Sequence, residues 1–239
     1  MKEFTVRLAG LPVAVSCEDL YTFNQCRNYL SQEEPAIFAR ADDRDISYSM
    51  ERSGISREAA ESFAVYKSIA DQLSRFDRLV FHGAAITYCE NGYLFSAPSG
   101  TGKTTHIKLW KRFFKDKVDI INGDKPIISA ERDGVYIHGT PWAGKEGWNK
   151  NLSAPLSGIC FVRQSRENRI KRLSPDKCLG MILPQVYIPK KSGAAGATLE
   201  LLDRILKNVP VYMLDCDISE EAVKCSFEAM TGLKYSENK

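Results

Sequence analysis

Residues 97–104 have the residue types and spacing of a phosphate-binding loop, with alanine at the first glycine position. Gly100 and Gly102 can adopt positive φ, which lets backbone N–H groups turn inward around phosphate oxygens. In this motif Lys103 reaches the β- and γ-phosphates, and the hydroxyl of Thr104 ligates Mg²⁺. The alternative is a glycine-rich turn that binds no ligand. The residues expected to hold ATP are Ser99, Gly100, Thr101, Gly102, Lys103, Thr104 and Thr105.

The residues around this segment predict a strand before it and a helix after it. Residues 92–95 read as a strand, and a helical pattern begins at Lys103. The N-terminus of that helix adds partial positive charge where an anion would bind. Residues 79–88 read as another strand, and Asn91-Gly92 predicts a hairpin between the two strands. The strand before a phosphate-binding loop usually lies in a parallel sheet, but this hairpin places an antiparallel strand beside it. We therefore expect a mixed sheet.

Phosphoryl transfer also needs a group for the acceptor proton and positive charge near the moving phosphoryl. Asp124 follows the predicted buried strand 118–121 and is the candidate proton acceptor or metal ligand, two roles that stay open here. The alternative is an aspartate that only closes a turn. His82, beside Gly83 in the preceding strand, is a candidate site residue, although a lone strand histidine is usually part of the core.

Residues 139–148, Gly-Thr-Pro-Trp-Ala-Gly-Lys-Glu-Gly-Trp, combine two tryptophans, a cation and a carboxylate. Lys145 is the candidate to neutralise the transferring phosphoryl group or to bind an anionic acceptor. Glu146 is a candidate to bind acceptor hydroxyls, and Trp142 completes the expected substrate-binding set. The alternative is a structural loop anchored by its tryptophans.

Composition excludes several classes of protein. The chain of 239 residues has a formal charge of only +3 without long runs of like charge, which argues against nucleic-acid binding. No apolar run is long enough to span a bilayer, and the charged start is not a signal peptide. Seven scattered cysteines without a Cys-x-x-Cys pair predict reduced thiols in a cytoplasmic protein. His106 and His138 are not expected to be catalytic.

The pattern of elements predicts two parts, a β-rich subdomain with a helix over residues 1–76 and a kinase core over residues 77–239. In the first part, strands are expected at 4–9, 12–17, 35–41 and 46–50, and a helix at 57–76. In the second part, further strands are expected at 126–130, 135–139, 155–163 and 209–214, and helices at 197–207 and 219–231.

His82-Gly83, the Asn91-Gly92 hairpin, the Ser-Gly-Thr-Gly-Lys-Thr-Thr sequence at 99–105 and the strand ending at Asp124 together resemble the HPr kinase and phosphoenolpyruvate carboxykinase superfamily. The resemblance covers about residues 79–140 and is greatest to small stand-alone HPr-kinase-like proteins. It implies an α/β fold with α+β character, in which the phosphate-binding loop belongs to a mixed, partly antiparallel sheet flanked by helices. Both families tend to have two adjacent acids where this chain has Gly123-Asp124.

These features predict a kinase that transfers the γ-phosphoryl group of Mg-ATP to a hydroxyl of a polyol, a sugar, or a serine of a peptide or protein. Lys103, Asp124, Lys145 and His82 are the expected catalytic residues, and Thr104 and Asp124 the expected metal ligands. Because Asp124 is a single acid at this position, a second class of function stays open, a non-catalytic module that senses ATP or phosphate. The expected partners are a nucleotide and a hydroxyl-bearing acceptor, not nucleic acid or membrane, with a homo-oligomer left open.

Overall fold

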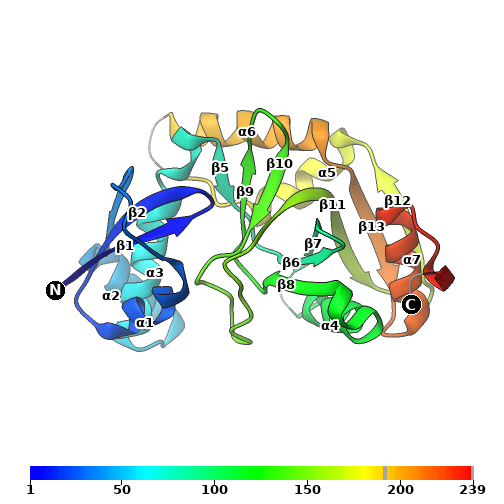
Figure 1. The fold of residues 1–239 in the computed structure, drawn as a ribbon, viewed down its shortest axis with the longest axis horizontal. Coiled ribbons are helices and arrows are strands. Elements are labelled where there is room, and N and C mark those ends of the chain that lie inside the picture. The colour runs from blue at the N-terminus through cyan, green and yellow to red at the C-terminus, as the bar shows by residue number, and fades with distance from the viewer. Residues whose placement is uncertain (99, 191–192, 238–239) are drawn as a thin grey trace.

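The computed structural model describes residues 1–98, 100–190 and 193–237, and Ser99 of the expected nucleotide site lies outside them. Helices flank two β-sheets in this part of the chain (Figure 1). The smaller sheet has the strand order β3-β1-β2-β4. The larger has the order β5-β9-β10-β11-β7-β6-β8, and β13 and β12 extend it from β11. The protein is therefore a mixed α/β structure.

Residues 1–76, which we call the N-terminal lobe, include the antiparallel pair β1 (Lys2–Leu8) and β2 (Leu11–Cys17). Ala9 and Gly10 join these strands with φ values of 49° and 78°, the positive values that a two-residue turn with right-handed twist requires. The other elements of the lobe are α1 (Leu20–Cys26), β3 (Leu30–Ser31), β4 (Ile37–Arg40), α2 (Asp43–Ser53) and α3 (Arg57–Ala70). The short 3₁₀ helices Arg27–Tyr29 and Leu73–Phe76 complete it.

The expectation of a strand at residues 46–50 is wrong, because these residues lie within α2. Asp42 caps this helix by accepting a hydrogen bond from the Arg44 N–H at 2.8 Å. Asp43 and Asp45 lie in the first turn, where carboxylates interact favourably with the helix dipole. The acidic stretch 42–45, which lies between two expected strands, is thus the start of a helix.

The larger sheet is mixed, as expected. β7 (Asn91–Ser96) pairs antiparallel with β6 (Ala84–Tyr88) and parallel with β11 (Ser153–Gln164). β11 pairs with β10 near its start and with β7 and β13 further along, so this one strand joins the two halves of the sheet. The remaining strands are β5 (Arg78–Val80), β8 (Val118–Asn122), β9 (Ile127–Ala130), β10 (Val135–His138), β12 (Arg169–Leu173) and β13 (Val211–Cys216).

Two details differ from the expectations for this sheet. The hairpin between β6 and β7 is confirmed, but its turn residues are Cys89 and Glu90, with φ values of 47° and 68°. The strand expected over residues 79–88 is interrupted at residues 81–83. There the chain passes from β5, which pairs with β9, to β6, which pairs with β7 and β8. This interruption contains His82.

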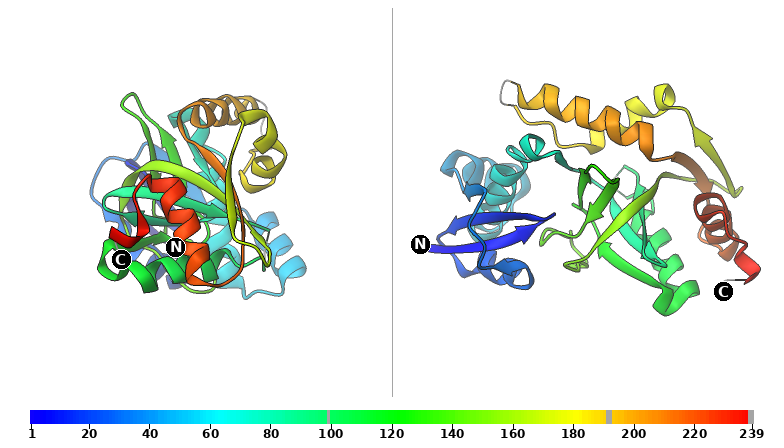
Figure 2. Two further views of the ribbon diagram at one scale, coloured as in Figure 1. Left: turned by 90° about the vertical axis from the view of Figure 1, so that its right-hand side faces the viewer. Right: turned by 45° about the horizontal axis from the view of Figure 1, so that its top comes forward.

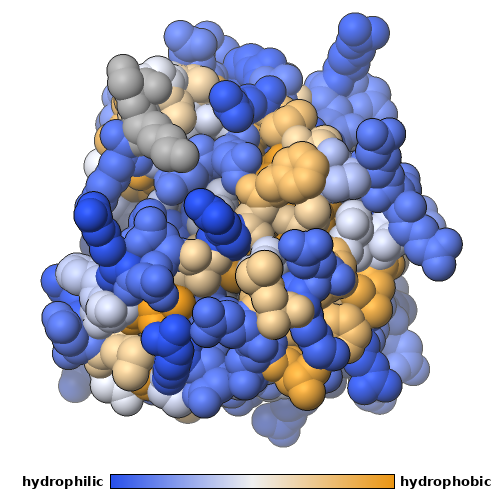
Figure 3. Space-filling view, turned by 90° about the vertical axis from the view of Figure 1, so that its left-hand side faces the viewer, coloured by the Kyte–Doolittle hydropathy of each residue, from blue (hydrophilic) through white to orange (hydrophobic). Residues whose placement is uncertain are grey.

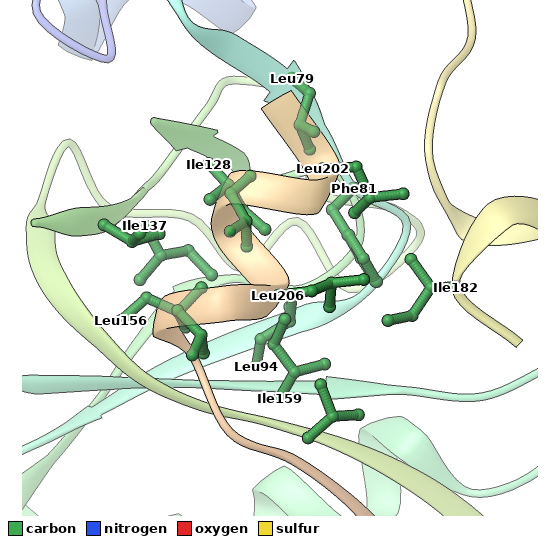
Figure 4. Close-up of a cluster of buried hydrophobic side chains, with 14 of the residues drawn as sticks. Leu79, Phe81, Leu94, Ile128, Ile137, Leu156, Ile159, Ile182, Leu202 and Leu206 are labelled. Carbon is green, nitrogen blue, oxygen red and sulfur yellow. The ribbon is translucent and has the colours of Figure 1, made fainter. Parts of the chain in front are cut away.

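Helices cover both faces of the larger sheet (Figures 1 and 2). Successive residues of β7 point to opposite faces, and Leu94 belongs to one buried cluster while Phe95 belongs to another. The first cluster lies under α6 (Ala194–Asn208), as Figure 4 shows, and includes Leu202 of that helix. The second contains Trp110 of α4 (Lys103–Phe114) and Phe227 of α7 (Glu220–Thr231), so both helices pack on this face of the sheet. The other helices are α5 (Pro175–Ile182) and the 3₁₀ helices Lys115–Lys117, Leu183–Gln185 and Tyr235–Glu237.

The core of the N-terminal lobe continues into the larger sheet. Its buried cluster contains Ile69 of α3 together with Ile127 of β9 and Trp142. The division at residue 76 therefore stays a prediction.

Viewed from the side of this lobe, apolar patches lie between hydrophilic side chains (Figure 3), and Phe38 is 71% exposed. Within the described ranges, we find no helix with the length and apolar character needed to cross a bilayer.

Candidate functional site

Three turns of the larger sheet meet at one of its edges. β7 and β8 both run antiparallel to β6, so their C-terminal ends lie beside the start of β6. The register confirms this arrangement, because Ala84 is opposite Phe95 and Ala85 is opposite Asn122. The turn before β6, the glycine-rich segment after β7 and the turn after β8 are thereby brought together.

The side chains of these turns make direct contact. Nε2 of His82 lies 3.3 Å from Nζ of Lys103 and 3.1 Å from Oδ1 of Asp124. Nζ of Lys125 lies 3.3 Å from the other carboxylate oxygen, Oδ2. We call these four residues, His82, Lys103, Asp124 and Lys125, the edge cluster. It contains three of the four expected catalytic residues, His82, Lys103 and Asp124, and Lys103 also belongs to the expected ATP site.

Backbone contacts fix the position of His82. Its N–H donates to the carbonyl of Gln185 at 2.6 Å, and its carbonyl accepts from the Ser96 hydroxyl at 2.9 Å. The next residue, Gly83, donates its N–H to the Asp124 carbonyl at 3.0 Å. A Cβ on Gly83 would lie 2.7 Å from Cδ1 of Leu94. The same Cβ would lie 3.0 Å from the carbonyl oxygen of Phe95, so glycine suits the close approach of this turn to β7.

The charges in the edge cluster alter the pKa values of its members. Burial alone raises the pKa of Asp124, but the hydrogen bond from His82 and the charges of Lys125 and Lys103 outweigh it, so the pKa is lowered. Burial lowers the pKa of Lys103, and the Asp124 charge opposes this effect. The cluster thus favours an ionised carboxylate next to lysines, an arrangement that suits both anion binding and proton acceptance.

In the glycine-rich segment between β7 and α4, two glycines have the positive φ that the sequence predicts for them. Gly100 and Gly102 have φ values of 81° and 107°. The N–H of Thr101 donates to the carbonyl of Pro98 at 3.2 Å, which closes a tight turn. Gly102 is the N-cap of α4, and no side chain caps this helix. The first-turn N–H groups of α4 are therefore not capped by a side chain.

Asn122 holds the turn that carries Asp124. Its Oδ1 accepts the N–H groups of Asp124 and Lys125 at 2.8 and 2.7 Å. Its Nδ2 donates to the carbonyl of Thr140 at 2.9 Å. The side chain is fully buried, so these bonds are not exposed to competition from water.

Gly123 explains the absence of a second acid beside Asp124. A Cβ at this position would lie 2.8 Å from the carbonyl oxygen of Ala143. The N–H of Gly123 donates to the carbonyl of Trp148 at 2.9 Å. The loop 142–148 therefore occupies the space that a side chain at residue 123 would need.

The other expected site residues lie on this loop or on α4. Lys145 and Glu146 are exposed, and Oε1 of Glu146 lies 3.7 Å from Nζ of Lys108. Trp142 is 3% exposed and packs into the N-terminal lobe. Thr104 is half-buried and Thr105 exposed in the first turn of α4. The edge cluster thus contains neither Lys145 nor Glu146.

His106 and His138 are buried outside the edge cluster. Nε2 of His106 lies 2.9 Å from Oγ of Ser226, and burial lowers the pKa of this histidine to about 4. Nε2 of His138 lies 2.8 Å from Oγ of Ser129, and burial, assisted by the charge of Arg78, lowers its pKa to about 4. Both imidazoles are therefore neutral parts of the core at pH 7.

Sequence reasoning did not select Lys125, Asn122 or Tyr66. Lys125 follows Asp124 directly and Asn122 lies two residues before it, which is the signal that could have identified them. Tyr66 belongs to α3 of the N-terminal lobe. Burial raises its pKa, and the charge of Asp124 raises it further. No local pattern in the sequence indicates that influence.

Comparisons with known proteins identify no family for this chain. No family model matches, and no curated protein matches. Among solved structures, the chain is similar to the HPr(Ser) kinase/phosphatase from Coxiella burnetii, with 10% sequence identity and a TM-score of 0.36. This match covers 64% of this chain and 93% of the other. Similarity at this level carries no weight in assigning a function, which has to rest on the residues.

Proposed function

We propose that this chain is an ATP-dependent kinase that transfers the γ-phosphoryl group of Mg-ATP to a hydroxyl of an acceptor. The observation that carries the proposal is the contact of His82, Lys103 and Asp124 at the end of a glycine-rich turn. Phosphoryl transfer depends mainly on positioning and on positive charge around the phosphoryl group. A cluster with a carboxylate and two lysines supplies both an acceptor for a proton and that charge.

The chemistry of the glycine-rich segment fits a nucleotide. Gly100 and Gly102 have positive φ, and a Cβ on either would meet nothing within 4 Å, so the space around the turn is open. The uncapped N-terminus of α4 attracts anions. The turn amides and Lys103 would hold the phosphates. Thr104 and Asp124 would serve the metal, because Mg²⁺ takes few protein ligands and keeps phosphate and water.

When bound, Mg-ATP supplies the activated phosphoryl group. Within the chain, Asp124 is ionised, as its lowered pKa requires, and either carboxylate oxygen can accept the proton of an acceptor hydroxyl. Lys103 neutralises charge on the side of the glycine-rich turn, and Lys125 does so beside Oδ2 of Asp124. We assign Lys145 and Glu146, which are exposed, to contacts with the acceptor.

The acceptor class is a polyol, a sugar, or a serine of a peptide or protein. The test is incubation of the purified chain with Mg²⁺ and γ-labelled ATP against a panel of these acceptors. A kinase transfers label to an acceptor, and the K103Q variant does not. Tight ATP binding without transfer to any acceptor would favour a nucleotide sensor instead. Release of inorganic phosphate without label transfer would identify a hydrolase and contradict the proposal.

A further inference from the structure

A continuous line of buried hydrogen bonds connects α3 of the N-terminal lobe to Asp124. Nε1 of Trp142 donates to Oγ and to the carbonyl oxygen of Ser62, at 3.0 and 3.2 Å. The carbonyl of Trp142 accepts from Nδ2 of Asn122 at 3.3 Å. Oδ1 of Asn122 then accepts the N–H groups of Asp124 and Lys125.

The three residues that link α3 to the Asp124 turn are removed from solvent. Ser62 is 2% exposed, Trp142 is 3% exposed and Asn122 is fully buried. Breaking one buried hydrogen bond leaves a desolvated polar group without a partner, which costs more than the bond itself contributes. The rings of Tyr66 and Trp142, 5.2 Å apart, support the same contact from α3. The position of Trp142 is thereby determined by the N-terminal lobe.

We propose that Ser62, Trp142 and Asn122 are positioning residues, through which the N-terminal lobe holds Asp124 against His82 and Lys125. The inference rests on the proposed function, in which Asp124 accepts the proton. It gives the N-terminal lobe a role in the site that is separate from the phosphate-binding segment. It also gives the buried indole of Trp142 a role other than acceptor binding.

Amide hydrogen exchange tests this coupling without any need for activity, because the Asp124 and Lys125 N–H groups are themselves in the line. Ser62→Val and Ser62→Thr form a matched pair, since both add a methyl group and only threonine keeps the hydroxyl. Trp142→Phe removes the N–H but keeps an aromatic ring. Trp148→Phe is the control on the same loop.

We expect Trp142→Phe to speed exchange at Asp124 and Lys125 by about tenfold, the factor that corresponds to one buried hydrogen bond. Ser62→Val should speed it by a smaller factor, because the indole N–H loses Oγ of Ser62 but keeps the backbone carbonyl. Exchange at Leu94, in the core of β7, should not change. Ser62→Thr and Trp148→Phe should exchange like the parent chain. Should Trp142→Phe fail to fold, the Ser62 pair alone decides.

The inference is overturned if Ser62→Val exchanges like Ser62→Thr at both amides, or if exchange rises equally at Leu94, which would indicate general destabilisation. Turnover gives the second readout: kcat should fall in Ser62→Val while KM for ATP is unchanged, and Ser62→Thr should restore it. If no acceptor supports turnover in the parent chain, the kinase proposal fails, but the exchange result still decides the coupling.

Discussion

Nε2 of His82 lies 3.1 Å from Oδ1 of Asp124 and 3.3 Å from Nζ of Lys103. One imidazole nitrogen cannot donate to the carboxylate and accept from the ammonium group at the same time. When Nε2 carries a proton it donates to Asp124, and when it does not it accepts from Lys103. The histidine therefore links the proposed proton acceptor to the lysine at the start of α4.

Replacing Lys103 should weaken nucleotide binding. Lys103→Gln is expected to raise the Kd of Mg-ATP by about tenfold or more, because hydrogen bonds to charged groups contribute about 1.5–3 kcal/mol. Isothermal titration calorimetry measures this change. Arg112→Gln, an exposed substitution on the same helix, is the control and should bind ATP as the parent chain does. Equal affinities for the two variants would contradict the assignment of Lys103.

Removing the charge of Lys125 should shift the acid limb of the pH profile of turnover. The Lys125 charge is one of the influences that lower the pKa of Asp124. In Lys125→Gln that pKa rises, so Asp124 becomes protonated at higher pH and turnover is lost nearer neutrality. The profile of kcat/KM against pH measures the shift. Lys145→Gln, at an exposed residue outside the edge cluster, should raise KM for the acceptor and leave the acid limb in place.

The positive φ of Gly102 should make alanine costly there. Gly102→Ala is expected to lower the free energy of unfolding by about 1–3 kcal/mol, because φ is 107° and L-residues are strained in that region. Nothing lies within 4 Å of the added Cβ, so the cost comes from the backbone alone. Gly180→Ala within α5 is the matched control and should stabilise by about 1 kcal/mol. Urea unfolding measures both, and similar values for the two variants would be inconsistent with the backbone described.

The buried histidines should make stability fall in acid. The folded-state pKa of His138 is lowered to about 4, below its unfolded value of about 6.5, so the unfolded chain binds the proton first. The stability from the neutral imidazole is fully present above about pH 6.5 and is lost as pH falls toward 4, by about 1.4 kcal/mol per pH unit. In His138→Gln, unfolding free energy should depend on pH less steeply by that amount. If the unfolding free energy of the parent chain and of His138→Gln depends on pH equally, His138 does not contribute to the loss of stability in acid.

Local sequence patterns predicted the parts of the site that lie along the chain. The glycine-rich turn, the hairpin before it and the position of Asp124 after a buried strand are all visible in short stretches of sequence. The break at His82 was not predicted, because the apolar pattern continues through it while the pairing partner changes from β9 to β7. Only the sheet topology determines that change.

The link between the N-terminal lobe and Asp124 could not be predicted for a similar reason. The contact of Ser62 with Trp142 joins residues far apart in the chain, and the sequence near either residue contains no pattern that predicts this contact. Residues 46–50 were misassigned because an acidic N-cap and first turn resemble a loop when the helix they begin is not recognised. The glycine at position 123 could not be explained from the sequence either, because the atom that excludes a side chain there is the carbonyl oxygen of Ala143, which lies on another loop.

The central claim is that Asp124 accepts the proton of an acceptor hydroxyl, and one pair of variants tests it most directly. Asp124→Asn removes the carboxylate charge of the edge cluster, and Asp119→Asn removes a partly exposed carboxylate of the preceding strand β8 that pairs with Lys150. We predict that Asp124→Asn lowers acceptor-dependent ADP release by about a hundredfold or more while ATP still binds, and that Asp119→Asn turns over normally. Equal turnover in the two variants would contradict the claim.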